Sequence, residues 1–374
     1  MAIVKRFPAG KTPYIRRADV STNTNLIMRD FLIALLPLVV FAWIKNGLLP
    51  FIAGDCGLFG MLYPLIFVAV GTLSGFIVEG LYFLIFKKEK DLSKLKESFS
   101  LIPGLLLAMI LPLNTPIWVL ILGSVFAILV GKMVFGGFGH NIFNPALIGY
   151  IFIMTAYYGV ISANGGYLNP SEVGILSGAT PLSSFFGATD LNEIIASYGG
   201  LSNFFFGFHS GSIAETSALL CLLAFVYLVV RKVINWRIPV IYITTVFVLT
   251  YIIGATQGYA LDLRYPLFQI FNGGLFFGAV FMATEPVTSP RTPNGKIFFA
   301  LFLAALTVML RYISDMAEGV ATSILFMNMF TPLLDRAMGK LRILGKDKKV
   351  IITYLILTVA VLAIFGFTLL QIGG

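Results

Sequence analysis

Long apolar runs recur from one end of the chain to the other, and they limit the folds that it can adopt. Of the 374 residues, 58% are hydrophobic and 11% are charged, whereas a soluble domain typically carries about 25% charged residues. A soluble fold this poor in charge could not cover its surface with polar groups. Since a helix needs about 20 apolar residues to cross the hydrocarbon layer, the sequence predicts an all-α polytopic membrane protein of about ten transmembrane helices.

Two of the apolar segments are short and end in proline-rich breaks. Segment 100–112 ends at Pro112, and segment 268–284 is followed by Pro286. Proline cannot continue a helix, and irregular backbone inside a bilayer is tolerated only where protein buries it or where it lines a cavity. Both segments are therefore predicted to be half-helices. The other apolar segments are 31–50, 59–86, 117–134, 141–158, 213–230, 238–254, 297–313, 318–336 and 350–371.

These breaks occupy matching places in the two halves of the chain, which predicts an inverted repeat. A Phe-Asn-Pro run at 143–145 follows the next full helix in the first half, and a Phe-Thr-Pro run at 330–332 does so in the second. Paired broken helices indicate a site at the interface between repeats; coincidence among apolar segments is the alternative. The predicted organisation is a cytoplasmic N-terminal segment at 1–29, a first membrane repeat at 30–158, an extracytoplasmic loop at 159–212, and a second repeat with a C-terminal helix at 213–374.

The distribution of basic residues predicts how the chain is oriented. The formal net charge is +9, but Lys and Arg occur in short clusters between apolar runs. This pattern is typical of cytoplasmic loops of membrane proteins and argues against a nucleic-acid partner. No Lys or Arg occurs between Lys132 and Arg231, so the loop at 159–212 is predicted to lie outside the cytoplasm, with the N-terminus inside. The first apolar run begins near Phe31, too late for a cleavable signal peptide.

Several cofactor classes are unexpected on composition and motif content. The chain has no GxGxxG run entering a helix, no Walker motif and no HExxH motif. Its two cysteines, Cys56 and Cys221, cannot supply the four thiolates of an iron–sulfur cluster or a structural zinc site. His140 and His209 lie far apart without metal-ligand spacing. We therefore expect no nucleotide, haem or metal site formed by this chain alone.

A short motif in the predicted outer loop carries a hydroxyl with little around it to obstruct access. Pro181 follows the motif and disfavours helical backbone for the residue before it, so the segment should be extended or turned. Such a segment could enter another enzyme's active site and be modified there. An ordinary polar turn of Ser, Gly and Thr is the alternative. The motif residues are Ser177, Gly178, Ala179 and Thr180.

This motif resembles the flavinylation sequence of two related families, the RnfD membrane subunits of Rnf complexes and their counterparts in sodium-pumping NADH:quinone oxidoreductases. The glycine-rich run Gly136 to Gly139 and the following His-Asn-Ile-Phe-Asn-Pro-Ala at 140–146 also resemble these families. So do the basic N-terminus and the two proline-broken helices, and the resemblance covers nearly the whole chain. A second Gly-Ala-Thr triplet ending at Thr189 has Phe186 before it, where the families have Ser or Asp, and is treated as a decoy. The compact chain is more similar to the Rnf subunit.

The resemblance implies a membrane flavoprotein subunit of an ion-translocating electron-transport complex in a bacterial or archaeal cell membrane, not catalytic alone. It implies FMN joined through a phosphoester to Thr180 by a flavin transferase, with other complex subunits, including a second covalent flavoprotein, as partners. Asn141 and Asn144 could bind a second, non-covalent flavin such as riboflavin, or could cap a helix start. Without the motif, the broken half-helices would favour a small-solute channel or transporter.

Charged residues in or beside the apolar segments are candidates for ion coupling. Glu285 lies at the second proline-rich break, and an ion pair with Arg291 is the alternative to a coupling role. Glu79 is expected near the cytoplasmic end of its helix, with its carboxylate reaching the interface. Arg311 and Asp315 are four residues apart, which is typical of a structural pair on a helix.

Overall fold

Every regular element that the structure describes is a helix. The computed structural model describes residues 24–87, 95, 98–163, 181–186, 190–213, 217–314, 319–344 and 348–373. The first half of the chain contains α1 (Thr24–Trp43), the π-helical turn η2 (Ile44–Leu48), α2 (Leu49–Ala53), α3 (Leu58–Ile85), α5 (Leu101–Ile110), α6 (Ile117–Ile128), the π-helical turn η3 (Leu129–Met133), α7 (Pro145–Ala156) and α8 (Tyr158–Ser162).

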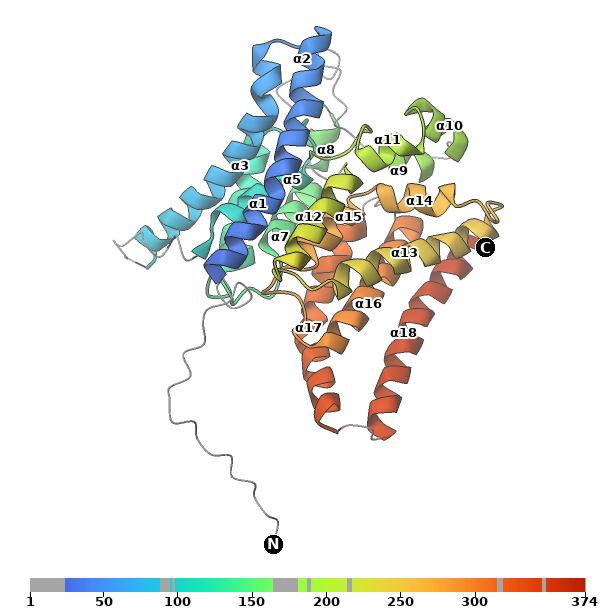
Figure 1. The fold of residues 1–374 in the computed structure, drawn as a ribbon. Helices are drawn as coiled ribbons and strands as arrows, with labels where there is room; N and C mark the ends of the chain where they lie inside the picture. The colour runs from blue at the N-terminus through green and yellow to red at the C-terminus, as the bar shows by residue number, and fades with distance from the viewer. Residues whose placement is uncertain are drawn as a thin grey trace.

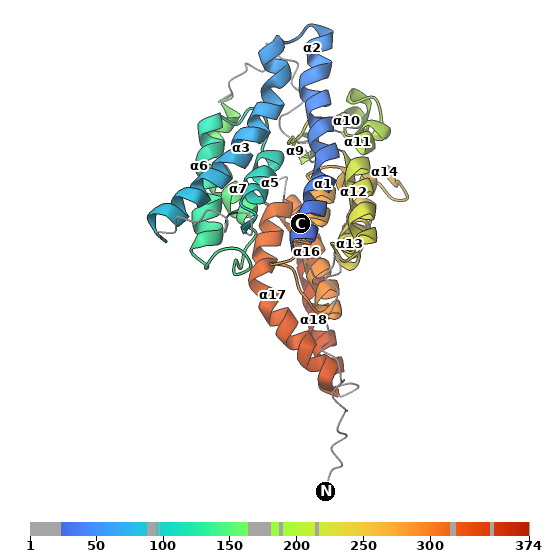
Figure 2. The same ribbon diagram turned by 60° about the vertical axis from the view of Figure 1, so that its left-hand side comes forward.

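Three short helices lead into the second half of the chain. They are α9 (Pro181–Phe186), α10 (Leu191–Ser197) and α11 (Leu201–Phe206). The second half contains α12 (Ala218–Val230), α13 (Arg237–Thr256), α14 (Arg264–Phe271), α15 (Leu275–Phe277), the π-helical turn η4 (Gly278–Met282), α16 (Pro293–Ile313), α17 (Gly319–Leu344) and α18 (Lys348–Gly373). In Figures 1 and 2, α1 and α3 form a long hairpin joined by α2 at one end of the molecule, and α17 and α18 project at the other.

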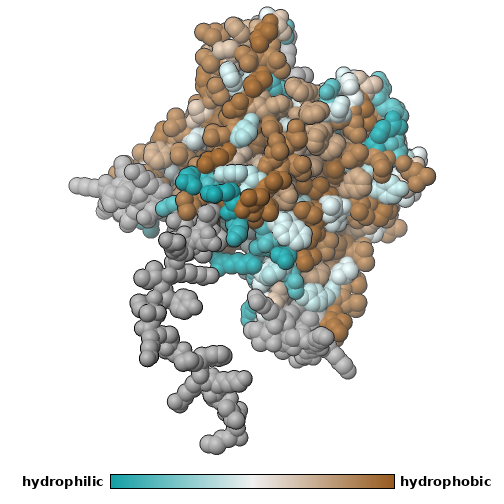
Figure 3. Space-filling view, viewed as in Figure 1, coloured by the Kyte–Doolittle hydropathy of each residue, from teal (hydrophilic) through white to brown (hydrophobic). Residues whose placement is uncertain are grey.

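The helices confirm an all-α, multi-pass membrane protein. Among the described residues, five helices are long and apolar enough to cross a bilayer, and α14 with α15 and η4 adds a sixth, bent candidate. Four further apolar helices are 10 to 17 residues long. Hydrophobic side chains cover most of the face in Figure 3, while hydrophilic ones gather near the lower ends of α1 and α12 and around α10. The predicted total of about ten spans stays a prediction.

Both proline-rich breaks predicted from the sequence end a helix in the structure. In the first half, α5 ends at Ile110 and α6 begins only at Ile117. In the second, η4 ends at Met282 and α16 begins at Pro293. Half-helix character is therefore confirmed for α5, which spans 10 residues.

The second broken segment also contains a break that the sequence analysis did not predict. Between α14 and α15 the chain bends by 62°. Gly273 and Gly274 have φ angles of 66° and 63° at this point, a left-handed conformation that glycine adopts without steric cost. The segment is thus two short helices at an angle.

A buried arginine holds this bend together. The Arg311 side chain, 1% exposed, donates to the carbonyl oxygens of Gln269 at 2.7 Å and Asn272 at 3.0 Å, and a third bond reaches Gly273 at 3.3 Å. The last carbonyls of a helix have no partner within the helix, and a cation near them is favourable. Asp315, the predicted partner of Arg311, lies outside the described residues.

The two halves repeat the same set of helix neighbours. In the first half α3 packs on α5 and α6, and α6 packs on α7; in the second, α13 packs on α14 and α16, and α16 packs on α17. Between the halves, α1 contacts α12 and α7 contacts α17. This is the pattern expected of two structural repeats. The predicted repeat boundaries at 30–158 and 213–374 stay predictions.

Glycines allow the closest helix contacts in the first half. A Cβ atom added at Gly104 of α5 would lie 2.2 Å from the carbonyl oxygen of Gly71 in α3. A Cβ atom added at Gly149 of α7 would lie 2.7 Å from the carbonyl oxygen of Gly123 in α6. Because lipid provides no hydrophobic drive for helix association, close backbone approach through small residues supplies the packing that joins these helices.

Candidate functional site

The motif Ser177 to Thr180 and the decoy Thr189 lie outside the described residues, but the segment directly after the motif is described. Helix α9 begins at Pro181, the residue next to Thr180, and proline is favoured at the first position of a helix. Leu182 is fully buried, and its side chain lies against the bend at Gly273. The segment that directly follows the motif is therefore anchored to the broken helix through Leu182.

An aromatic cluster surrounds this anchor. Phe185 of α9 packs its ring 5.7 Å from that of Tyr265 and 5.8 Å from that of Phe268, both on α14. Phe204 of α11 is fully buried and packs on the same Phe268 ring at 5.4 Å. Among the aromatic residues near the motif, Phe185 and Phe204 thus pack within the protein, whereas Phe206 is 46% exposed.

Tyrosine hydroxyls form hydrogen bonds among the segments that pack next to α9. The Tyr265 hydroxyl lies 2.6 Å from the Tyr312 hydroxyl and donates to Gln257 at 2.9 Å. The Tyr259 hydroxyl donates to Asp190, just before α10, at 3.4 Å. Burial and the nearby Asp190 carboxylate raise the pKa of Tyr259. The Tyr259 bond joins the start of α10 to the connection between α13 and α14, and the Tyr265 bonds join α14 to the end of α13 and to α16.

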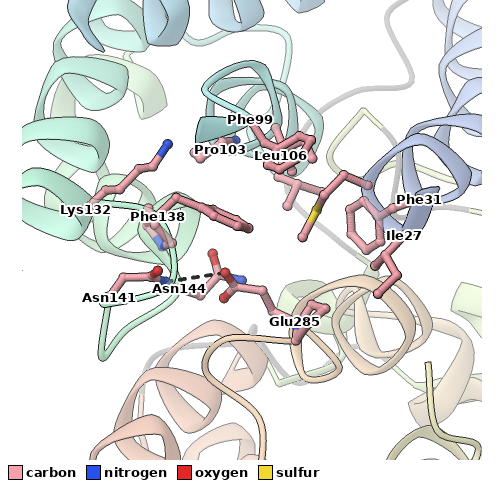
Figure 4. Close-up of a pocket in the computed structure, with 14 residues that line it drawn as sticks. Ile27, Phe31, Phe99, Pro103, Leu106, Lys132, Phe138, Asn141, Asn144 and Glu285 are labelled. Atoms are coloured by element: carbon pink, nitrogen blue, oxygen red, sulfur yellow. Dashed lines mark hydrogen bonds between the residues drawn. The ribbon is translucent and has the colours of Figure 1, made fainter. Parts of the chain in front are cut away.

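A second candidate site is a pocket beside the N-terminal end of α5. Figure 4 shows it between α1, α5, the Gly136–Gly139 loop and the start of α7. Three aromatic rings form much of its wall, those of Phe31, Phe99 and Phe138. Its free volume is about 40 Å³, enough for water-sized molecules and too little for an aromatic ring.

Three polar side chains meet on one wall of this pocket. Asn141 donates to the Glu285 carboxylate at 3.4 Å, the bond dashed in Figure 4, and to the Phe143 carbonyl at 3.1 Å. Asn144 caps α7, accepting from the Ala146 amide at 3.0 Å, as the capping alternative predicted. Its own amide nitrogen is buried and has no hydrogen-bond partner among the described residues, so the pocket wall offers an unused donor.

An ion pair borders the pocket. Lys132 lies in η3, and its ammonium is 2.7 Å from the Glu79 carboxylate and 2.6 Å from the Ser98 carbonyl oxygen. The Ser98 hydroxyl donates to the same carboxylate. The side chains of Lys132 and Glu79 are 2% and 0% exposed. The expectation that Glu79 reaches the interface was therefore wrong, because Lys132, on a different helix, neutralises it in the interior.

For Glu285, the alternative of an ion pair with Arg291 was also wrong. Besides Asn141, Glu285 accepts a bond of 2.8 Å from the Thr288 hydroxyl. Asp335 of α17 accepts from the Arg291 backbone amide at 2.8 Å. Both carboxylates thus brace the turn between η4 and α16.

Sequence reasoning did not select Lys132 and Phe138 as site residues. The available signal was Lys132 itself, a cation within an otherwise apolar run, which is a functional candidate by default in membrane proteins. Phe138 carries no such signal; its ring is placed by the glycine loop and lies 5.9 Å from the Lys132 ammonium.

Comparison with known proteins places these features in a family. The chain matches the NQR2, RnfD, RnfE family over residues 10–343. It is 35% identical to the RnfD subunit of the proton-translocating ferredoxin:NAD(+) oxidoreductase complex of Clostridium ljungdahlii, over 88% of this chain and 94% of that protein. It is 32% identical to the RnfD subunit of the Na(+)-translocating ferredoxin:NAD(+) oxidoreductase complex of Acetobacterium woodii, over 90% and 95% of the two chains.

A protein from a second kind of complex is also similar. One subunit of the Na(+)-translocating NADH-quinone reductase of Pseudomonas paraeruginosa is 31% identical, over 75% of this chain and 68% of that protein. The relatives are thus subunits of ion-translocating oxidoreductase complexes. The family model covers most of the chain, and the coverage is more complete for the two RnfD relatives than for the NADH-quinone reductase subunit. The chain belongs to the NQR2, RnfD, RnfE family.

Proposed function

We propose that this chain is the membrane flavoprotein subunit of a redox-driven, ion-translocating complex of the ferredoxin:NAD type, and that it carries FMN covalently on Thr180. The observation that carries the proposal is the Ser-Gly-Ala-Thr motif in a chain that aligns along most of its length with the RnfD relatives. The chain is not catalytic alone. It relays electrons and acts with the other subunits of its complex.

The residues around the motif suit a fixed cofactor. The Thr180 hydroxyl would form the phosphoester to the FMN phosphate, and the small residues Gly178 and Ala179 leave that oxygen accessible. Leu182 and Phe185 hold the following helix against α14, so the attachment point has a short tether to a buried anchor. When bound, FMN supplies one- and two-electron transfer, while the protein supplies its position.

The pocket beside Asn141 and Asn144 is the proposed site of a second, non-covalent flavin such as riboflavin. The donor chemistry fits, because the buried Asn144 amide nitrogen has an unused hydrogen and flavin carbonyl oxygens are acceptors. The volume of about 40 Å³ does not admit the ring, so binding requires the pocket to widen. Gly136, Gly137 and Gly139, with φ angles of 112°, 98° and 87°, give the loop that carries Phe138 a backbone able to rearrange.

The proposal includes an orientation and a set of partners. The N-terminus and the Lys- and Arg-rich loops face the cytoplasm, and the loop with Thr180 faces the other side. The partners are the other subunits of the complex, including a second covalent flavoprotein, and a flavin transferase during maturation. A small-solute channel is the second candidate function, favoured by the bend at Gly273 and Gly274 and by the paired proline breaks.

A cysteine at Ser197 tests the orientation. Ser197 is exposed in α10. The background protein has Cys56 replaced by serine and Cys221 replaced by alanine. In this background, Ser197→Cys should react with an impermeant maleimide in intact cells. The matched control is Lys87→Cys, exposed after α3, which should react only after lysis. The reverse pattern would invert the topology.

Reduction of the purified protein tests the relay function. The chain has no nucleotide-binding motif, so its covalent flavin should be reduced by dithionite and should not respond to NADH within seconds in stopped-flow absorbance. In the intact complex, the same flavin should respond to NADH or to reduced ferredoxin. Rapid bleaching of the isolated protein by NADH would contradict an electron relay, and a protein without any flavin band after expression with a flavin transferase would favour the channel.

A further inference from the structure

A second, larger cavity opens among helix ends beside the first pocket, with which it shares Ile27 and Pro286. Its volume is about 260 Å³. It lies between the start of α1, the connection from α12 to α13, and the chain segment that leads into α16. Asn141 and Asn144 do not line it.

The cavity is lined by cations. Lys232, Arg291 and Lys296 all contribute to its wall, and no Asp or Glu of the described residues does so. Asp335, an acid near the Arg291 end of the cavity, is occupied by the backbone amides of Arg291 and Thr292 at 2.8 and 2.9 Å and by the Thr292 hydroxyl at 2.7 Å. These neutral donors leave the Asp335 charge in place, but the three cations in the wall outnumber this one nearby acid, and the charge is unbalanced.

The surrounding charges increase this imbalance. Arg237, at the start of α13, lies close enough to Lys296 to repel its charge, against a smaller attraction from Asp335. Holding like charges together in a partly desolvated site is unfavourable unless an anion joins them. A bound anion would remove that repulsion, since it would be attracted to every cation in the wall.

The backbone around the cavity also favours an anion. α13 and α16, helices of 20 and 21 residues, both begin beside it, and the first turn of a helix presents a positive dipole end. Polar side chains of Asn235 and Ser289 line the same space. Cations and uncharged donors arranged around one volume match the several oxygen acceptors of a phosphate group.

The position of the cavity indicates where that phosphate comes from. It lies where the apolar helix α12 ends and α13 begins, and Trp236 between them is 48% exposed and stacks under Arg237 at 5.3 Å. Exposed tryptophan beside Lys and Arg is typical of the level of lipid headgroups. Basic pockets between membrane helices on the cytoplasmic side bind acidic headgroups.

We infer that the cavity formed by Lys232, Arg291 and Lys296 is a phosphate-anion site, occupied in the membrane by the headgroup of one acidic phospholipid. This site is independent of the proposed flavin chemistry. It would fix an anionic lipid at the junction of α12, α13 and α16.

The test measures lipid binding to the full-length, delipidated protein by native mass spectrometry. The variant is Lys232→Gln with Arg291→Gln; both side chains are exposed, and the backbone bond from Arg291 to Asp335 is kept. Each cation near the headgroups contributes about 1 kcal/mol to lipid binding, which is about fivefold in affinity. The double variant should therefore bind phosphatidylglycerol about thirtyfold more weakly than wild type. The matched control is Lys87→Gln with Arg336→Gln, two exposed basic residues that do not line the cavity, and this variant should bind within about threefold of wild type.

Two further arms identify the anion. Phosphatidylcholine with the same acyl chains should bind to wild type and double variant alike. Inorganic phosphate, added at equal ionic strength, should shift the melting temperature of the protein little. A shift as large as that given by phosphatidylglycerol, and lost in the double variant, would support a phosphate site but show that its occupant is soluble phosphate. Equal loss of phosphatidylglycerol binding in the double variant and the control, with unchanged melting temperatures, would overturn the site. So would equal binding of both lipids to wild type.

Discussion

Replacing Thr180 with alanine is expected to abolish covalent flavin completely in protein produced together with a flavin transferase. The phosphoester requires a hydroxyl, and alanine has none, while the change removes too little volume at a loop position to disturb the helices that follow. The readout is in-gel flavin fluorescence after denaturation, together with the mass of the tryptic peptide that contains the motif. The melting temperature of the variant should match that of wild type.

Thr189→Ala is the matched control for this prediction. It removes the hydroxyl of the second Gly-Ala-Thr triplet in the same segment of the chain and should leave fluorescence unchanged. FMN mass that persists in the Thr180 variant, or that is found on Thr189, would refute the assignment of the attachment site.

Lys132→Met is expected to destabilise the protein by about 3–5 kcal/mol, because it leaves the Glu79 carboxylate buried without its partner. Both side chains are almost completely buried, at 2% and 0% exposure, so bulk solvent does not screen the carboxylate that is left. The free energy of unfolding would be measured by denaturation in mixed micelles. The double variant Lys132→Met with Glu79→Leu should recover most of that loss, since no charge is then left unpaired.

An exposed ion pair provides the comparison. Arg264 is 56% exposed and pairs with Asp262 at 2.7 Å, and Arg264→Gln should cost no more than about 1 kcal/mol. Equal losses from Lys132→Met and Arg264→Gln, or a double variant as unstable as Lys132→Met alone, would contradict the view that Glu79 depends on Lys132.

The sequence was informative wherever the determining residues are close together in the chain. The breaks after α5 and η4 could be predicted because proline ends a helix by its own covalent geometry. The bend at Gly273 was missed because an Asn-Gly-Gly run inside an apolar segment is tolerated in many straight membrane helices. What fixes the bend is Arg311, and that contact becomes visible only in three dimensions.

The candidate sites show the same limit. Asn144 was considered as a helix cap or, from the family resemblance, as a flavin ligand, and its capping bond is confirmed. Glu285, on the same wall of the pocket, is 144 positions from Asn141, the residue to which it bonds. Glu79 was misjudged for the same reason, since Lys132 is 53 positions away. The position of Glu79 near the end of its helix predicted a carboxylate that reaches water, whereas in the structure Lys132 pairs with it.

The position of the Lys132 side chain depends on the number of residues in the π-helical turn Leu129–Met133. Each residue of an α-helix turns the chain by about 100°, and a π turn accommodates one additional residue within a single turn. Val130 in this turn is 39% exposed, whereas Gly131 and Lys132 are buried. Deleting one residue here would convert the π turn into an ordinary α turn, which holds one residue fewer, and would change the angular position of Lys132 relative to Glu79. The number of residues in this segment, and not only their identity, therefore determines where the charge lies.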